Sequence, residues 1–316
     1  MSIGALLKRK LASLGRVVGL NDLREQIIES KLLSAKLLIN QMKLRGALTR
    51  ISDAEFKVFS QFGDDGIIQY LIHLIGIPRD KQIFVEFGVQ NYQESNTRFL
   101  LMNDNWRGLI LDGDKANMDY VIQSADYWRY DLTAVAAFID RDNVNDLFLQ
   151  HGFSGEIGLL SVDIDGNDYW VWERIEAVNP MIVVAEYNSS FGAQHAVTIP
   201  YDPTFQRSRA HYSNLYWGAS LKALCLLAKN KGYAFVGCNS AGNNAYFVRL
   251  DKLADIIPLE AEHGYVAARF RESRNEEGYL TYLSGSACLQ EISNMELFDI
   301  EQAAVIRIAD LYKNTK

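Results

Sequence analysis

The chain has 316 residues, of which 48% are hydrophobic and 22% are charged. These values are ordinary for a globular protein and exclude a disordered or fibrous chain. The formal net charge of -7 argues against a general nucleic-acid binder. No apolar run approaches the roughly 18 residues of a membrane-spanning helix, and basic residues interrupt any secretory signal. Cys225, Cys238 and Cys288 have neither metal-ligand nor disulfide spacing, so we expect a cytoplasmic protein.

The first 50 residues differ in charge from the rest of the chain. They hold ten basic and three acidic side chains, a net charge of +7, whereas the remainder carries -14. From Asn21 to Arg45, apolar residues recur every three or four positions without Pro or Gly, which predicts an amphipathic helix. We expect a separate basic helical element over residues 1–50. Its apolar face packs on its own domain or in a homo-oligomer, and peripheral membrane contact is the alternative.

Residues 51–316 are expected to form one α/β domain, because helices and strands alternate from about residue 60. The expected strands are 83–88, 108–114, 157–166, 181–188, 233–238 and 244–250. The expected helices include 64–75, 95–102, 115–123, 143–151, 168–175 and 219–231. This alternation predicts a mostly parallel sheet with helices on both faces. The last two strands are joined by only a short link, which predicts an antiparallel pair.

Two further segments of this domain have their own patterns. Residues 189–218 are rich in aromatic residues, with Pro and Gly but little periodicity, and we expect a lid at the ligand-binding end. His195 and His211 in this segment are candidate general bases, because the pKa of histidine lies near neutrality. Arg207 and Arg209 are candidates for contact with an anionic acceptor or for surface salt bridges. A helical tail is expected at the end of the chain.

Carboxylates stand where four of the expected strands end. They are Glu86, Asp112, the pair Asp163 and Asp165, and Glu186. Ligands of open α/β sheets bind at the carboxyl ends of the strands, so these residues predict one acidic site. Gly88 follows the first strand and lets a ligand approach the backbone. The GxGxxG pattern is absent there, which favours an adenosine cofactor without a diphosphate.

The segment DIDGND, residues 163–168, has a spacing that suits a hard cation. Asp163 and Asp165 can converge with Glu186 and Asn188 of the following strand. Oxygen ligands without His or Cys favour magnesium, manganese or calcium. The alternative is that residues 165–168 only cap the next helix.

Five segments taken together are similar to a known family. They are VEFGVQNYQESNT, WRGLILDGD, LLSVDIDGNDYWVWE, VVAEYN and GASLKALCLLAKNKGYAFVGCNSAGNNAYFVR. Their order and spacing resemble the S-adenosylmethionine-dependent methyltransferases of the FkbM-like group and its sugar O-methyltransferase relatives, over about residues 60–250. The resemblance implies a seven-stranded Rossmann-like sheet whose last strand is antiparallel.

The resemblance also implies roles for individual residues. Glu86 and Gly88 would lie at the methionine moiety of the cofactor, Asp112 would take its ribose, and Asp131 would lie near its adenine. Ser95 and Asn96 are candidates for the cofactor's carboxylate. The acidic segment resembles that of metal-dependent O-methyltransferases, where a metal held by residues such as Asp163 binds the acceptor's hydroxyls. The expected function is therefore metal-assisted O-methylation of a sugar or glycan-type acceptor.

Three alternatives to this function are open on the sequence alone. Phosphatases of the haloacid dehalogenase type also carry DxDG, but no later acidic pair with their spacing follows residue 168. Glycosyltransferases that hold a nucleotide diphosphate through DxD would leave Glu86 and Asp112 without a role. A non-catalytic Rossmann-like scaffold that binds a partner is the third alternative.

Overall fold

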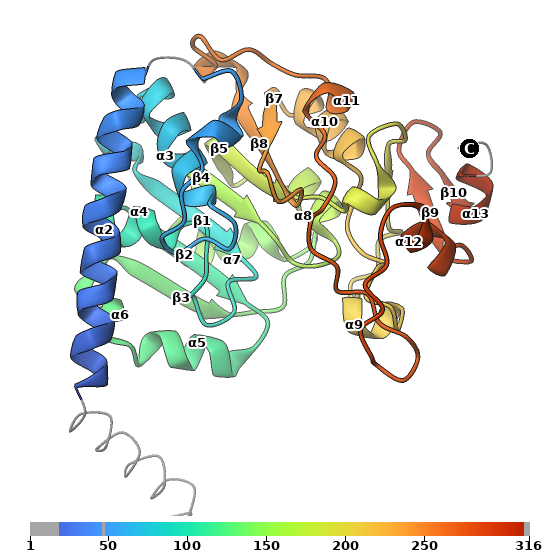
Figure 1. Ribbon diagram of the computed structural model, residues 1–316, viewed down its shortest axis with the longest axis horizontal. Coiled ribbons are helices and arrows are strands. Elements are labelled where there is room, and N and C mark those ends of the chain that lie inside the picture. Colours follow the sequence, from blue (N-terminus) through green and yellow to red (C-terminus); the bar gives the residue numbers. More distant parts are fainter. Residues whose placement is uncertain (1–18, 46–47, 313–316) are drawn as a thin grey trace, which may run out of the picture. The chain divides into compact units, whose positions relative to one another are not determined.

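The structure is a computed structural model that describes residues 19–45 and 48–312 (Figure 1). The chain divides into two units, Met1–Gly46 and Ala47–Lys316. Among the described residues, no helix combines the length and the apolar character needed to cross a membrane. The predictions that concern residues 1–18 lie outside the described residues.

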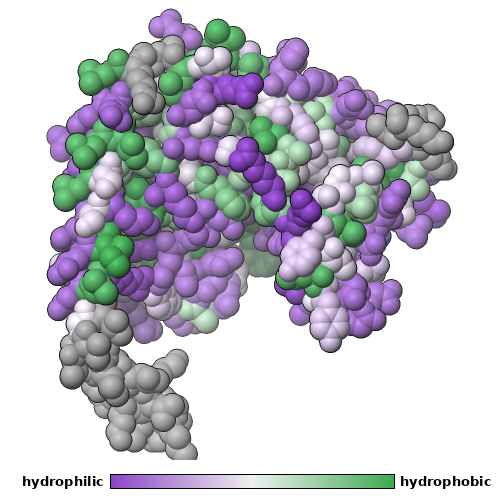
Figure 2. Space-filling view, in the orientation of Figure 1, coloured by the Kyte–Doolittle hydropathy of each residue, from purple (hydrophilic) through white to green (hydrophobic). Residues whose placement is uncertain are grey.

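The described part of the first unit is one helix, α2 (Leu20–Arg45), of 26 residues. Its bounds agree with the helix expected from Asn21 to Arg45, because no Pro or Gly interrupts this stretch. Several of its apolar side chains are exposed, among them Leu37 and Leu44. Figure 2 shows hydrophobic residues along α2 between hydrophilic ones. Contact with a second copy of the chain and contact with a membrane both stay predictions.

The second unit is built on a seven-stranded sheet in the order β3-β2-β1-β4-β5-β8-β7. Its strands are β1 (Ile83–Phe87), β2 (Arg107–Asp112), β3 (Leu132–Ala136), β4 (Gly155–Val162), β5 (Val178–Glu186), β7 (Tyr233–Cys238) and β8 (Asn244–Arg249). Neighbouring strands are parallel except at β8, which runs antiparallel to both β5 and β7. This order and the antiparallel last strand confirm the expected Rossmann-like sheet.

Helices pack around this sheet because its strands are apolar on both faces. They are α3 (Asp64–Ile75), α4 (Arg98–Asp104), α5 (Lys115–Ile122), α6 (Ala125–Arg129), α7 (Val144–Gln150), α8 (Asp168–Arg174) and α10 (Leu221–Asn230), with short 3-10 turns at η1 (Ile51–Ala54), η2 (Arg79–Lys81) and η4 (Leu250–Lys252). Val85 and Phe87 of β1 belong to one core with Phe148 of α7 and Trp172 of α8. Since strand residues alternate between faces, Glu86 points to the opposite face.

Residues 189–218 and the end of the chain form a second, smaller sheet. Its strands are β6 (Val197–Thr198), β9 (Glu296–Asp299) and β10 (Ala304–Arg307), all antiparallel, in the order β10-β9-β6. Short helices accompany it: η3 (Ser189–Phe191), α9 (Arg207–Ala210), α12 (Ser286–Glu291) and α13 (Ile308–Leu311), whereas α11 (Ala261–Gly264) packs against α10 and β7 of the main sheet. Figure 1 shows β9 and β10 beside α12 and α13, apart from the main sheet.

The small sheet corrects the expected helical tail and shows regular structure within residues 189–218. The tail of the chain is helical only in part, because Leu297 and Asp299 of β9 are buried while Glu296 is exposed, the alternation of a half-buried strand. Residues 189–218, whose sequence has little periodicity, contain β6, and their role as a lid stays a prediction. Val197 of β6 packs with Leu297 and Ile308 in a separate apolar core, which ties this segment to the end of the chain.

Candidate functional site

The chain reverses its direction across the sheet between β1 and β4, which are neighbours. From β1 it proceeds outward to β2 and β3, and from β4 it proceeds to β5 on the other side. Ligands of open α/β sheets bind at such a reversal. A cavity of about 210 Å³ lies at the carboxyl ends of these strands. Its walls include Gly88, Gln90, Asp112, Phe138, Asp163, Asp165, Asn167 and Phe205.

Gly88 sets the distance between the two central strand ends. Its φ is +68°, and a Cβ built on it would lie 1.8 Å from the backbone oxygen of Asp163. No side chain larger than hydrogen fits there, and a positive φ already favours glycine. The loop after β1 therefore passes directly against the end of β4, and this contact places Asp163 at the cavity.

Asp112, at the end of β2, lines the cavity with a carboxylate whose orientation is fixed. Its Oδ2 accepts a hydrogen bond from the Gln90 backbone N at 2.7 Å, and its Oδ1 accepts one from the Asp114 N at 2.8 Å. Asn117 Nδ2 donates to Oδ1 at 3.2 Å. A carboxylate offers about four acceptor sites, so these three donors leave room for a ligand hydroxyl.

Glu86, at the end of β1, holds the chain segment before α4. Its buried carboxylate accepts hydrogen bonds from Ser95 Oγ at 2.5 Å, Asn96 N at 2.8 Å and Thr97 N at 3.1 Å, and from Thr97 Oγ1. Burial raises the pKa of Glu86 although these bonds favour its charged form. Ser95 and Asn96 are thus bound to Glu86, and none of the three lines the cavity, so their expected contacts with the cofactor stay predictions.

The expected contact between Asp131 and the adenine is wrong, because Asp131 lies at the edge of the sheet opposite the cavity. It directly precedes β3, and its backbone oxygen accepts a hydrogen bond from Gly108 at the beginning of β2. It therefore belongs to the amino ends of the strands, opposite Asp112. The segment that does reach the cavity is the carboxyl end of β3, with Phe138 and Ile139. Recognition of the short strand LTAVA in the sequence would have pointed to them.

Three of the predicted acidic residues do come together. Asp163, Asp165 and Glu186 each offer a carboxylate oxygen, and these atoms lie within 4.8 Å of one another. Burial, and next the repulsion between neighbouring carboxylates, raises the pKa of both Asp163 and Glu186 well above the usual range. Glu186 is 8% exposed, and its Oε2 has no hydrogen-bond partner among the described residues. The cluster thus has the charge and the free oxygen that suit a divalent cation.

Two further residues of this region, Asp168 and Asn188, carry oxygens that could bind a metal, but they also have structural roles. Asp168 is buried, and its carboxylate accepts hydrogen bonds from Ile164 N at 2.8 Å and Gly166 N at 2.9 Å, so it holds the loop before α8 and does not cap the helix, whose first turn has no side-chain cap. Asn188 donates to the backbone oxygens of Leu215 and Trp217, both at 3.0 Å. Its Oδ1 accepts from Ser190 N at 3.0 Å. Asn188 ties down the segment after β5, and its expected role as a metal ligand stays a prediction.

Arg207 of α9 brings a positive charge to the cluster. Its Nη1 lies 2.5 Å from Asp165 Oδ1, and the same guanidinium pairs with Glu272. The group also stacks on Trp217, with its Cζ 4.6 Å from the ring centroid. Arg207 therefore forms a salt bridge, which was the alternative to contact with an anionic acceptor. A cation held by the cluster would share Asp165 with Arg207. Only the folded chain brings Arg207, 42 residues away in sequence, to Asp165.

Neither candidate histidine lines the cavity. His195 precedes β6 and packs edge-on against Tyr312, with ring centroids 5.4 Å apart. His211 follows α9, and its Nδ1 lies 2.8 Å from Ser213 Oγ. Burial lowers the pKa of His211. The structure does not bring either residue to the acidic cluster.

No protein-family model and no curated protein matches the chain. Solved structures do match it, among them two that contain SAH. The N-terminal domain of EvdMO1 with SAH bound has a TM-score of 0.38 and 10% identity, over 68% of this chain and 94% of that one. An O-methyltransferase from Bacillus cereus in complex with SAH has a TM-score of 0.37 and 10% identity, over 69% and 89%. We base the fold class on the strand order.

Proposed function

We propose that this chain is an S-adenosylmethionine-dependent O-methyltransferase that uses a divalent cation and acts on a hydroxyl of a sugar or glycan-type acceptor. One observation carries the proposal. At the chain reversal of a methyltransferase-like sheet, a single cavity is lined by Asp112 on one side and by Asp163 and Asp165 on the other. Asp112 is suited to binding a ribose, and Asp163 and Asp165 are suited to binding a cation.

The residues of the cavity suit the cofactor. When bound, S-adenosylmethionine supplies an electrophilic methyl group. Asp112 has an acceptor site left for a ribose hydroxyl, because its present partners hold it without saturating it. Phe138 and Ile139 offer apolar surface for an adenine ring. Gly88 leaves the backbone bare where the ligand passes the end of β1.

The acidic cluster suits a cation, since its three carboxylates repel one another and Arg207 pairs with only one of them, Asp165. Asp163, Asp165 and Glu186 would hold it, and the unpartnered Glu186 Oε2 supports this assignment. When bound, a divalent cation lowers the pKa of an alcohol. Without the cation, the raised pKa values of Asp163 and Glu186 favour a proton kept by this pair.

The cofactor assignment is tested by calorimetric titration with S-adenosylhomocysteine. Asp112→Asn should lower the affinity about tenfold or more, because a charge-assisted hydrogen bond is worth about 1.5–3 kcal/mol. Asp131→Asn is the matched control, because Asp131 lies at the opposite edge, and it should bind like the parent. Equal affinities for the parent and Asp112→Asn would contradict the ribose assignment.

The cation is tested separately with manganese, whose binding is followed by paramagnetic resonance. Glu186→Gln should bind manganese at least about tenfold more weakly, by analogy with the loss of partners around metal sites. Glu173→Gln on the exposed face of α8 is the control. Methyl transfer should also stop in chelator and return with magnesium or manganese. Cofactor binding without any transfer would favour the scaffold alternative.

A further inference from the structure

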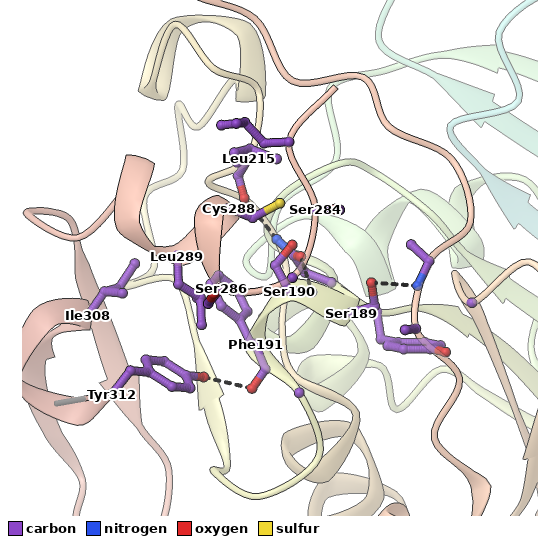
Figure 3. Close-up of a pocket in the computed structure, with 18 of the residues that line it drawn as sticks. Ser189, Ser190, Phe191, Leu215, Ser284, Ser286, Cys288, Leu289, Ile308 and Tyr312 are labelled. Atoms are coloured by element: carbon purple, nitrogen blue, oxygen red, sulfur yellow. Dashed lines mark hydrogen bonds between the residues drawn. The ribbon is translucent and has the colours of Figure 1, made fainter. Parts of the chain in front are cut away.

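The structure holds a second and larger cavity, of about 740 Å³ (Figure 3). It lies between the end of β5 and the C-terminal segment, which the resemblance to methyltransferases does not cover. Asn188, Arg207 and Trp217 line one part of it. Arg207 of this lining contacts Asp165, so one side chain separates this part of the large cavity from the cluster.

Another part of the same cavity is apolar. Leu289 and Tyr312 line it and are partly exposed, and the further lining residues Phe191, Leu215, Cys288 and Ile308 are at most 8% exposed and contribute little open surface. The latter four belong to the core of the small sheet, and Leu289 of α12 packs against that core. Figure 3 shows these side chains gathered around the cavity. The small sheet thus contributes an apolar chamber as well as a core.

The charged residues of the lining are balanced. They are Arg207, Arg271, Glu262 and Glu272. Arg207 and Glu272 pair with each other, so the wall beside the cluster presents no net charge from this pair. Ser284 and Ser286 are exposed members of the lining. A balanced polar wall favours an uncharged, hydroxyl-bearing group over an ion.

We propose that this cavity binds the methyl acceptor, and that the acceptor is amphiphilic. Its uncharged, hydroxyl-bearing head lies by Arg207, beside the acidic cluster, and its apolar chain or ring system fills the apolar chamber lined by Leu289 and Tyr312. That the bound amphiphile is the methyl acceptor rests on the proposed function, whereas the binding does not. An apolar chain buried there gains affinity with each methylene that leaves water.

Alkyl β-glucosides with hexyl, heptyl and octyl chains test this, each used below its micelle-forming concentration and titrated into the full-length protein by calorimetry. We expect the affinity to rise about fourfold with each methylene. Leu289→Glu places a charge in the apolar chamber and should abolish this dependence. Leu250→Glu is the matched control, because Leu250 is 56% exposed and does not line the cavity.

A second variant covers the case in which Leu289→Glu does not fold. Ser286→Trp changes an exposed residue of the lining, so the fold should tolerate it, and its ring should weaken octyl glucoside binding at least tenfold. Affinity that does not depend on chain length, or a dependence kept in both variants, would overturn the proposal. If S-adenosylhomocysteine does not bind but the affinity for glucosides still rises with chain length, the proposed function is wrong. The proposal that the cavity binds an amphiphile would then still hold.

Discussion

Replacement of Glu86 by Gln tests how the end of β1 is organised. A glutamine oxygen can accept from Ser95 and Thr97, but its NH2 group then faces the Asn96 N–H, a donor against a donor. One buried N–H left without an acceptor costs about 1–3 kcal/mol. The remaining bonds also lose the help of the negative charge. The easier burial of a neutral amide offsets part of this loss, so we expect a net destabilisation of about 2 kcal/mol.

Urea unfolding at pH 7.5 measures this loss, with Glu94→Gln as the matched control. Glu94 is an exposed neighbour that pairs with Lys57 at the surface, so its replacement should change the free energy of unfolding by less than about 0.5 kcal/mol. Glu86→Gln should also weaken binding of S-adenosylhomocysteine, because residues 95–97 lose their anchor beside the site. If Glu86→Gln is as stable as the parent, the described role of the carboxylate is wrong.

Three further predictions follow from the same edge of the sheet. Gly88→Ala should destabilise the chain by at least about 3 kcal/mol more than Gly155→Ala in urea unfolding, since both glycines have a positive φ but only Gly88 meets backbone; equal effects would contradict the close contact. Burial raises the pKa of Asp168 from 3.8 to about 6, so the folded chain holds this proton more tightly than the unfolded chain. The free energy of unfolding in chelator should therefore fall by up to about 3 kcal/mol from pH 4 to pH 6, and Asp168→Asn should lack this part of the slope. Asn188→Ala, which removes three hydrogen bonds, should speed proteolytic cleavage within residues 189–218; unchanged cleavage would show that Asn188 does not tie the segment down.

Much of the main sheet could be predicted because its elements carry strong local patterns. Helix α3 begins and ends where its apolar periodicity begins and ends, and the link at residues 239–243 is too short for anything but a hairpin. Strand β3 was missed because its five residues follow a polar segment and are only partly buried. The error at Asp131 came directly from this omission, since the carboxyl end of an unrecognised strand cannot be located.

The acidic cluster could be predicted in part, for a related reason. Asp163, Asp165 and Glu186 were found because parallel strands bring their carboxyl ends to one edge. The roles of Asp168 and Asn188 were not foreseeable, because both are decided by hydrogen bonds to particular backbone groups. The contact of Arg207 with Asp165 and the small sheet both depend on pairing between distant segments, which leaves no local pattern.

The most direct test of the proposed site is a crystal structure with S-adenosylhomocysteine and manganese, the metal being located by its anomalous scattering. We predict one manganese ion bound by Asp163, Asp165 and Glu186, and the ribose of the ligand at Asp112. A ligand bound elsewhere, or no anomalous peak at the three carboxylates when manganese is saturating, would contradict the assignment of a metal-assisted methyltransferase.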